Sequence, residues 1–291
     1  MPSDAPALVW EMPAELGEGP VWVERDQALW FVDIKKQQVH RYDPATGGKR
    51  SWDAPEQIGF ILPAEDGGFV AGLQSGLYRF DETSGSFDLI VEVEPELPGN
   101  RLNDGVVDLA GRLWFGTMDN SEKAKTGAFY CFAEGVLTKT PIDNIAITNG
   151  PTVSPDGRLL YFVDTLKGTI ESAEIHDDGT LGGRRPFARI DPQNGHPDGP
   201  TIDSDGHVWI SLYAGWEAWR YAPNGERVAR VRFPVANITK IAFGGEGLRR
   251  AFATTARQML SAEQIARQPL IGSLFEFQVT VPGVPCPLVR L

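Results

Sequence analysis

The sequence predicts an all-β protein, a six-bladed β-propeller whose four-stranded antiparallel blades surround a central channel, with residues 1–291 forming a single domain. Three observations predict this fold: an internal repeat, a tight-turn signal inside most repeats, and one buried-type aromatic residue in each. Repeats with a period of about 40 to 50 residues are typical of propellers and solenoids. The 32 Gly and 22 Pro residues fit such a fold, because many short strands require many turns.

Each repeat opens with a strand, a turn and a second strand. The six aligned segments are GPVWVERDQALWFVD, GFILPAEDGGFVAGL, GVVDLAGRLWFGTMD, GPTVSPDGRLLYFVDT, GPTIDSDGHVWISLY and KIAFGGEGLRRAFATT. Turns such as SPDG and DSDG supply the positive φ that a tight hairpin needs. The second strand of each segment carries an aromatic landmark, and the landmarks are Trp30, Phe69, Trp114, Tyr161, Trp209 and Phe252. They are 39 to 48 residues apart, so one falls in each repeat.

Further strands follow several landmarks, as in QVHRYDPATG and GLYRFDETSG, which favours four strands per repeat. Six such sheets arranged radially bury their apolar positions between neighbouring blades. We expect the N-terminal ALVWEM and the final SLFEFQVT and PLVRL to pair within one sheet and close the ring. The one helix predicted is SAEQIARQP, which begins with a Ser cap and ends at a Pro.

Charge and composition exclude several functions. The formal net charge is −12 and the Lys and Arg residues are dispersed, so we expect no nucleic-acid partner. No stretch approaches the roughly 20 apolar residues of a membrane span, and the first residues lack the features of a signal peptide. These patterns predict a cytoplasmic protein with no obligate protein partner. Cys131 and Cys286 are expected to be reduced thiols, and the four His residues lack metal-ligand spacing.

Oxygen-bearing side chains recur at one phase of the repeat, 11 or 12 residues before the landmark. They stand just before the predicted first strand in Glu18-Gly19-Pro20, Asn149-Gly150-Pro151, Asp198-Gly199-Pro200 and Asn103-Asp104-Gly105. Equivalent positions in a propeller point to the same end of the channel. Carboxylates and carboxamides that converge there are costly unless a cation lies among them. We therefore predict one divalent metal ion, held by Glu18, Asn149 and Asp198.

Ligation by oxygen alone suits Ca²⁺, Mg²⁺ or Mn²⁺, while Zn²⁺ and Fe²⁺ remain alternatives. The competing explanation is ordinary turn chemistry, because Asn and Asp often bond to their own backbone, but Glu18 fits that explanation poorly. Asp104 is expected to orient its neighbours, and Arg101 to project toward the same mouth. Asp33, Asp119 and Asp164 follow the landmark strands, where we expect them to cap strand ends. Lys240 and Tyr213 are further candidates to line the pocket.

The motifs LGEGPVW, NRLNDGVVD, ITNGPTVSPDGRLLYFVDT, PDGPTIDSDGHVWISLY and FGGEGLRRAFATTAR resemble the regucalcin/gluconolactonase family, also called senescence marker protein-like. The resemblance covers nearly the whole chain. It implies a six-bladed propeller that hydrolyses sugar lactones with one divalent metal, whose ligands match Glu18, Asn149 and Asp198. It also implies substrate contacts at Arg101 and Asn103. A further acidic substrate contact of the family falls near Ser121 in this chain, and this departure leaves the sugar open.

Among family members, the pattern is most similar to bacterial pentonolactonases such as xylonolactonase or arabinonolactonase, and gluconolactone remains an alternative substrate. In the expected mechanism, the metal polarises the lactone carbonyl and Asp198, as ligand or nearby base, takes a proton from the attacking water. Arg101 and Asn103 would orient the ring hydroxyls. Two alternatives remain: a phosphotriesterase on the same scaffold, and a non-enzymatic calcium-binding propeller. No GxSxG, HExxH, CxxC or P-loop motif supports another enzyme class.

Overall fold

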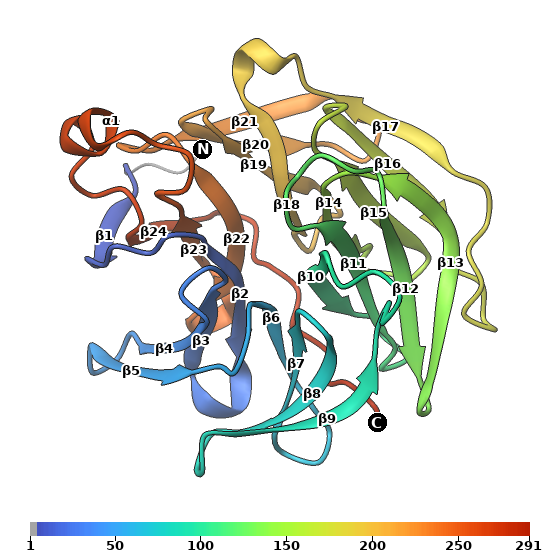
Figure 1. Cartoon of the computed structure of the whole chain (residues 1–291). Coiled ribbons are helices and arrows are strands. Elements are labelled where there is room, and N and C mark those ends of the chain that lie inside the picture. The colour runs from blue at the N-terminus through green and yellow to red at the C-terminus, as the bar shows by residue number, and fades with distance from the viewer. Residues whose placement is uncertain (1–4) are drawn as a thin grey trace.

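The computed structural model describes residues 5–291, which form six four-stranded antiparallel sheets arranged as the blades of a closed ring (Figure 1). The innermost strands of successive blades contact one another in ring order, and the last contacts the first. The prediction of a six-bladed β-propeller is therefore confirmed. In a ring of six, blades 3 and 6 lie opposite each other.

The blades follow one another along the chain. Blade 1 comprises β2 (Gly17–Val23), β3 (Ala28–Asp33), β4 (Gln38–Asp43) and β5 (Gly48–Asp53), and blade 2 comprises β6 (Ile58–Pro63), β7 (Phe69–Leu73), β8 (Gly76–Asp81) and β9 (Ser86–Glu92). Blade 3 comprises β10 (Asn100–Val107), β11 (Leu113–Asp119), β12 (Gly127–Ala133) and β13 (Val136–Ile145), and blade 4 comprises β14 (Thr148–Val153), β15 (Leu159–Asp164), β16 (Thr169–Glu174) and β17 (Arg185–Arg189). Blade 5 comprises β18 (His196–Ile202), β19 (Val208–Tyr213), β20 (Glu217–Tyr221) and β21 (Arg227–Arg232), and blade 6 comprises β22 (Ile238–Gly244), β23 (Arg250–Thr255), β24 (Leu274–Gln278) and β1 (Ala7–Trp10).

Blade 6 joins the two ends of the chain, because β1 pairs antiparallel with β24. This part of the predicted closure is confirmed. The prediction for PLVRL is wrong, since Val289 forms a parallel bridge with Ala64 of blade 2 and the amide of Arg290 donates to Gly111 O of blade 3 at 3.0 Å. The fourth position of blade 6 is already taken by β1, and Val289 is buried in the apolar core beside blade 2. The C-terminal segment therefore contacts blades 2 and 3 instead of adding a strand to blade 6.

The aromatic landmarks are all buried, at 0 to 4% exposure, on the second strand of their blades. In three blades the indole N–H of the landmark donates to an Asp in the preceding turn: Trp30 to Asp26, Trp114 to Asp108 and Trp209 to Asp203, at 2.8 to 3.1 Å. Each bond satisfies the one polar group of a large buried side chain. Asp108 and Asp203 also accept hydrogen bonds from backbone amides of their turns, so these two residues stabilise both the turn and the core.

Every innermost strand contains a bulge at the same level, and this feature builds the site. The register shifts lie between Glu18 and Val21, Ile58 and Phe60, Leu102 and Gly105, Asn149 and Thr152, Pro197 and Pro200, and Ile238 and Ile241. The repeated motifs therefore lie within the first strands, and the prediction that they precede them is wrong. A bulge re-aims the side chains beside it and breaks the ladder where Gly and Pro fit best.

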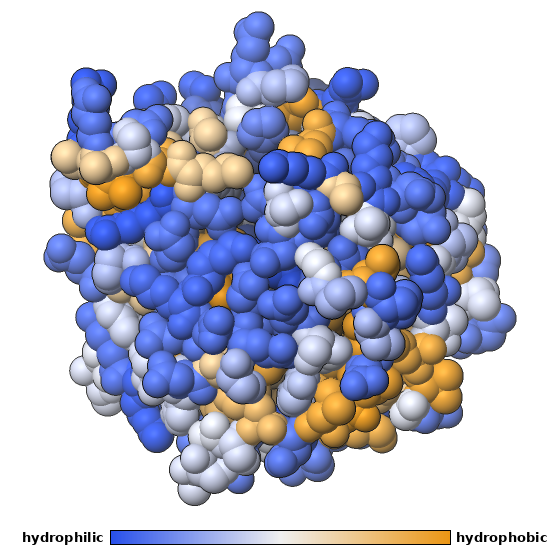
Figure 2. All heavy atoms as spheres, viewed as in Figure 1, coloured by the Kyte–Doolittle hydropathy of each residue, from blue (hydrophilic) through white to orange (hydrophobic). Residues whose placement is uncertain are grey.

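Helical structure is sparse. The helix α1 (Ala262–Arg267) begins with a capping box in which Ser261 and Gln264 bond each other's backbone, as the sequence predicts. Three short 3₁₀ turns cover Glu24–Asp26, Pro192–Asn194 and Glu246–Leu248. Within residues 5–291, no helix has the length and apolar character needed to cross a membrane. Hydrophilic side chains cover the middle of the face shown in Figure 2, and hydrophobic ones gather toward its rim.

Candidate metal centre

Glu18, Asn149 and Asp198 come from the bulges of blades 1, 4 and 5 and are 6%, 4% and 6% exposed. The innermost strands that carry them run in the same direction relative to their blades, so all three residues lie at one level of the channel. Glu18 lies close enough to Asp198 to raise the pKa of the Asp198 carboxyl. This placement is consistent with the sequence prediction that the three residues face one end of the channel.

The protein environment disfavours negative charge at both carboxyl groups. Burial, and then the neighbouring Asp104, raises the pKa of Glu18 to about 8, although the Gly19 amide opposes this by donating to Glu18 Oε2 at 2.9 Å. Burial, and then Glu18, raises the pKa of Asp198 well above its usual value. Two buried carboxylates that repel each other are stabilised when a positive ion lies between them. The pair therefore has the electrostatic character of a cation site.

Asn149 contributes a carboxamide whose orientation is fixed on both sides. Its Nδ2 donates to Thr165 Oγ1 at 2.9 Å, and its Oδ1 accepts a hydrogen bond from Asn103 Nδ2 at 3.1 Å. Asn103 Nδ2 also donates to Thr148 O, which ties blade 3 to blade 4. Because a carboxamide oxygen has two lone pairs, Asn149 Oδ1 retains one for another partner.

Asp104 lies beside this group but is bound by protein donors. Its Oδ1 accepts from the Gly105 amide at 2.8 Å and from Lys240 Nζ at 2.6 Å, and its Oδ2 accepts from the Gly150 amide at 3.0 Å. The prediction that Asp104 orients its neighbours is confirmed by these bonds. Lys240, one of the further candidates of the sequence, lies within the cluster.

Arg101 is almost completely buried, at 2% exposure, and burial lowers its pKa to about 10. Its Nη1 donates to Asn103 Oδ1 at 2.5 Å and to Leu102 O at 3.1 Å. Its Nε has no hydrogen-bond partner among residues 5–291. A buried guanidinium with an unused donor is suited to bind a polar ligand, because leaving that donor unpaired is costly.

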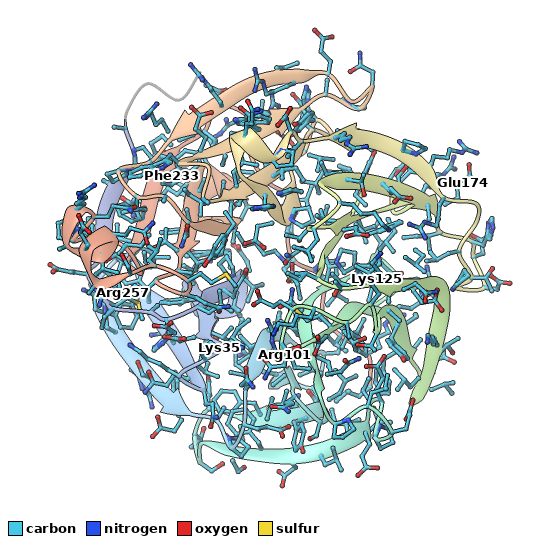
Figure 3. The ribbon with its side chains drawn as sticks, turned by 45° about the horizontal axis from the view of Figure 1, so that its top comes forward. Lys35, Arg101, Lys125, Glu174, Phe233 and Arg257 are labelled. Atoms are coloured by element: carbon cyan, nitrogen blue, oxygen red, sulfur yellow. The ribbon has the colours of Figure 1, made fainter. Side chains whose placement is uncertain are left out.

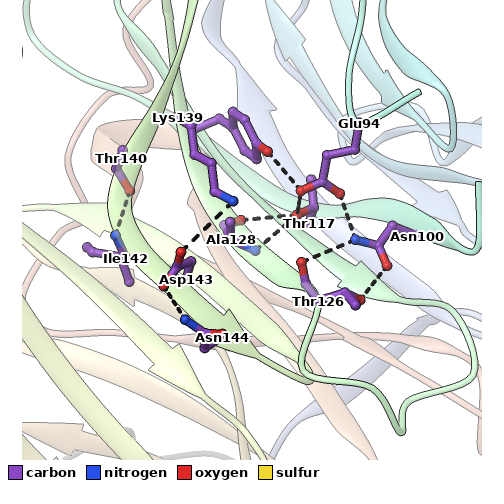
Figure 4. Close-up of polar contacts among 11 residues, drawn as sticks. Glu94, Asn100, Thr117, Thr126, Ala128, Lys139, Thr140, Ile142, Asp143 and Asn144 are labelled. Carbon is purple, nitrogen blue, oxygen red and sulfur yellow. Dashed lines mark hydrogen bonds and ion pairs between the residues drawn. The ribbon is translucent and has the colours of Figure 1, made fainter. Parts of the chain in front are cut away.

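A buried network holds the start of β10, which carries Arg101 and Asn103 (Figure 4). Glu94 accepts hydrogen bonds from Asn100 Nδ2 at 2.7 Å, Thr117 Oγ1 at 2.9 Å and the Tyr130 hydroxyl at 2.8 Å. The Tyr130 pKa is raised by burial and by its bond to Glu94. Thr117 of β11 and Tyr130 of β12 thus hold, through Glu94, the side chain of Asn100, which directly precedes Arg101.

Residues at the rim of the mouth were missed by sequence reasoning. Lys35 Nζ donates to Gln57 Oε1 at 2.9 Å and to Asn120 Oδ1 at 2.7 Å, joining blades 1, 2 and 3. Its side chain lies near that of Arg101 at the centre of the ring (Figure 3), and burial and Arg101 lower its pKa. Gln258 Nε2 donates to Glu122 Oε1 at 2.7 Å, which links blade 6 to blade 3.

The strand-end acids behave as predicted. Asp33 accepts from the Glu15 and Leu16 amides, and Asp164 accepts from the Lys167 amide. Asp119 accepts from the Ser121 hydroxyl and the Ala124 amide, which lower the pKa of Asp119. Ser121 therefore belongs to this cap, and the adjacent Glu122 brings an acidic side chain across the mouth.

The donor set fits a hard divalent cation. Among residues 5–291 no group of three or more His, Cys, Asp and Glu side chains is arranged to hold a metal. A site built on Glu18 and Asp198 would therefore need a carboxamide, such as that of Asn149, as its third side-chain ligand. Two carboxylates and one carboxamide supply only oxygen, which suits Ca²⁺, Mg²⁺ or Mn²⁺. Three protein ligands would leave coordination positions for water and substrate.

A cavity of about 360 Å³ lies on the other side of the bulges. It is lined by Pro20, Pro151 and Pro200, the residues that follow the candidate ligands by two positions, and is covered by residues 284–287. Its walls are mainly apolar. Lys240 also lines this cavity, whereas Glu18, Asn149 and Asp198 do not, so the cavity adjoins the candidate metal centre without containing its candidate ligands.

The comparisons with known proteins agree with this fold. Residues 16–257 match the family model described as SMP-30/Gluconolactonase/LRE-like region. The chain is 34% identical to 6-deoxy-6-sulfogluconolactonase of Pseudomonas putida, covering 96% of this chain and 97% of the relative. It is 36% identical to L-arabinolactonase of Azospirillum brasilense, covering 97% and 95%.

A solved structure of regucalcin from Agrobacterium tumefaciens, described as a calcium-binding protein, superimposes with a TM-score of 0.95 at 31% identity. The match covers 99% of this chain and 98% of that one. The family predicted from the motifs is confirmed by these matches. The chain belongs to the SMP-30/gluconolactonase/LRE-like family, which includes regucalcin.

Proposed function

We propose that this protein is a sugar lactonase that hydrolyses an aldonolactone to the aldonic acid and depends on one divalent cation. The proposal is supported by Glu18 and Asp198, two buried and interacting carboxyl groups with raised pKa values, which occupy the same bulge position in their blades as the fixed carboxamide of Asn149. Two relatives that match over nearly the whole chain are named as lactonases of sugar acids, which supports the same reaction class.

Glu18, Asn149 and Asp198 would hold the cation, which we infer to be Ca²⁺, Mn²⁺ or Mg²⁺, with Zn²⁺ and Fe²⁺ as alternatives. When bound, the cation supplies Lewis-acid stabilisation of the negative charge that develops on the lactone carbonyl oxygen. Asp198 also serves as the base in this proposal, because a carboxylate oxygen at this position can accept the proton of the attacking water. The ester C–O bond of the ring then breaks, and Asp198 returns the proton to the ring oxygen, which leaves as a hydroxyl group.

Arg101 and Asn103 would bind the hydroxyl groups of the lactone ring. The unpaired Nε of Arg101 offers a donor, and the bond from Arg101 Nη1 to Asn103 Oδ1 keeps both side chains in a fixed relation. Such positioning lowers the entropic cost of reaching the reactive geometry. We propose a pentonolactone, such as xylonolactone or arabinonolactone, as the substrate, with gluconolactone as the second choice.

A pH-stat assay tests this proposal, because the aldonic acid formed in each turnover is ionised at neutral pH and releases one proton. We expect hydrolysis of pentono- and hexonolactones above the spontaneous rate by the protein with Ca²⁺ or Mn²⁺, loss of that activity after chelation, and recovery when the cation is restored. Paraoxon serves as the comparison substrate. Turnover of paraoxon without any lactone would instead indicate a phosphotriesterase, and no turnover of either would favour a binding protein.

A further inference from the structure

A buried ion pair spans the channel beneath the candidate metal centre. Lys240 of β22 and Asp104 of β10 come from opposite blades, and the distance from Nζ to Oδ1 is 2.6 Å. Their side chains are 9% and 3% exposed. In surroundings with so little water, leaving either charge without its partner is costly. The two charges therefore depend on each other.

The path of Lys240 is shaped by its neighbours. A Cβ atom on Gly199 would lie 2.7 Å from both Cβ and Cγ of Lys240, closer than such atoms approach. Glycine at this position therefore leaves room for the lysine stem beside Asp198. The stem is directed at Asp104 across the channel, so the ammonium group is held in place by packing as well as by charge.

Lys240 reduces the net negative charge that a metal ion in this cluster would have to balance. Glu18, Asp104 and Asp198 lie close enough that Asp104 contributes to the raised pKa values of the other two. With Lys240 paired to Asp104, the charges of Glu18 and Asp198 add to −2, which a single divalent cation balances. Arg101 interacts first with Glu122 and then with Glu18 and Asp198, so its positive charge also favours the ionised form of these two carboxyl groups.

We propose that the Lys240 ammonium is a built-in counter-ion that keeps Asp104 out of metal coordination. Asp104 is thereby reserved as an anchor for the backbone of Gly105 and Gly150, the residue that follows the candidate ligand Asn149. A free carboxylate at this position would be a hard oxygen ligand for a divalent cation. This inference rests on the metal site of the proposed function but not on lactone hydrolysis.

Two single substitutions with opposite expected signs test the proposal. Lys240→Met retains the stem that packs on Gly199 and removes the charge, so Asp104 becomes available and Ca²⁺ should bind about tenfold more tightly or with a second equivalent. Asp104→Asn leaves the ammonium unpaired near the site and should weaken Ca²⁺ binding about tenfold. The double variant should return to within about threefold of the wild-type affinity, because neither charge remains.

Isothermal titration calorimetry with CaCl₂, together with metal content after dialysis, provides both readouts without any lactone. Circular dichroism and melting temperatures establish that each variant is folded. If Lys240→Met alone does not fold, comparison of Asp104→Asn with the double variant still measures the effect of the Lys240 charge. Weaker binding in both single variants, or unchanged binding in both, would overturn the counter-ion role. If the wild-type protein binds no divalent cation, the metal site and this inference both fail.

Discussion

Replacing Asp198 by Asn is expected to lower kcat/KM for the preferred aldonolactone by about a thousandfold. The substitution retains the size of the side chain but removes its negative charge and its capacity to accept a proton. Asp198 is the one side chain to which the proposal assigns both ligation and proton transfer, so its replacement should have the largest effect on activity. The measurement is the initial rate against lactone concentration at a fixed Ca²⁺ or Mn²⁺ concentration.

Asp205→Asn provides the matched control, because Asp205 lies exposed in a hairpin turn of the same blade. We expect its activity to equal that of the wild-type protein. Added Ca²⁺ should raise the melting temperature of the wild type and of Asp205→Asn but not that of Asp198→Asn, because ligand binding stabilises only the folded state that binds. Full activity and full metal content in Asp198→Asn would refute both roles of this residue.

The metal-free protein is expected to lose stability as the pH rises from about 4.5 to about 8, the usual and the raised pKa of Glu18. In this window the Glu18 carboxyl is ionised in the unfolded chain and protonated in the folded one, so the folded state binds more protons. The free energy of unfolding should therefore fall with increasing pH, by roughly 1.4 kcal/mol per pH unit from Glu18 alone. The raised pKa of Asp198 acts in the same direction.

Urea unfolding of chelated protein across this pH range measures the slope, and Glu18→Gln is the matched variant that cannot ionise at this position. We expect a shallower slope in Glu18→Gln than in the wild type. Saturating Ca²⁺ should remove the destabilisation in the wild type, because the cation stabilises the ionised carboxylates and its affinity rises as they lose protons. An identical slope in the two metal-free proteins would contradict the electrostatic account of the site.

Much of the fold was predictable because its signals are local and repeated. A turn with Gly or Asp-Gly, followed by a strand with a large aromatic residue, specifies a hairpin without reference to distant residues. The landmark Trp114 shows the reason, since its indole N–H bonds to Asp108 in the adjacent turn. Six copies of this unit cannot bury their apolar faces separately, so the repeat also indicates the ring.

The candidate ligands were predictable for a similar reason, because their phase relative to the landmarks is constant. Their placement within bulged strands was not predicted, although Gly followed by Pro inside a strand is a signal for a bulge. The Pro200 position illustrates this, since it pairs with Ile210 directly after the register shift that contains Asp198 and Gly199. The motif of an oxygen-bearing residue followed by Gly and Pro was interpreted as the start of the first strand, whereas it marks a bulge within that strand.

Contacts between distant parts of the chain could not be predicted. Lys240 and Asp104 are 136 residues apart, and so are Gln258 and Glu122. Neither pair has a local pattern, because which blades face each other depends on closure of the whole ring. The C-terminal PLVRL was predicted to pair in one sheet with ALVWEM and SLFEFQVT, whereas burial of Val289 against blade 2 determines its position.

The position of a bound cation tests the central claim most directly. Anomalous diffraction from a crystal soaked in Mn²⁺ locates the ion without assuming its ligands. The account predicts one dominant peak, with side-chain oxygens of Glu18, Asn149 and Asp198 each about 2 to 2.6 Å from it. A dominant peak elsewhere, or an ion that any of these three side chains does not touch, would contradict the account.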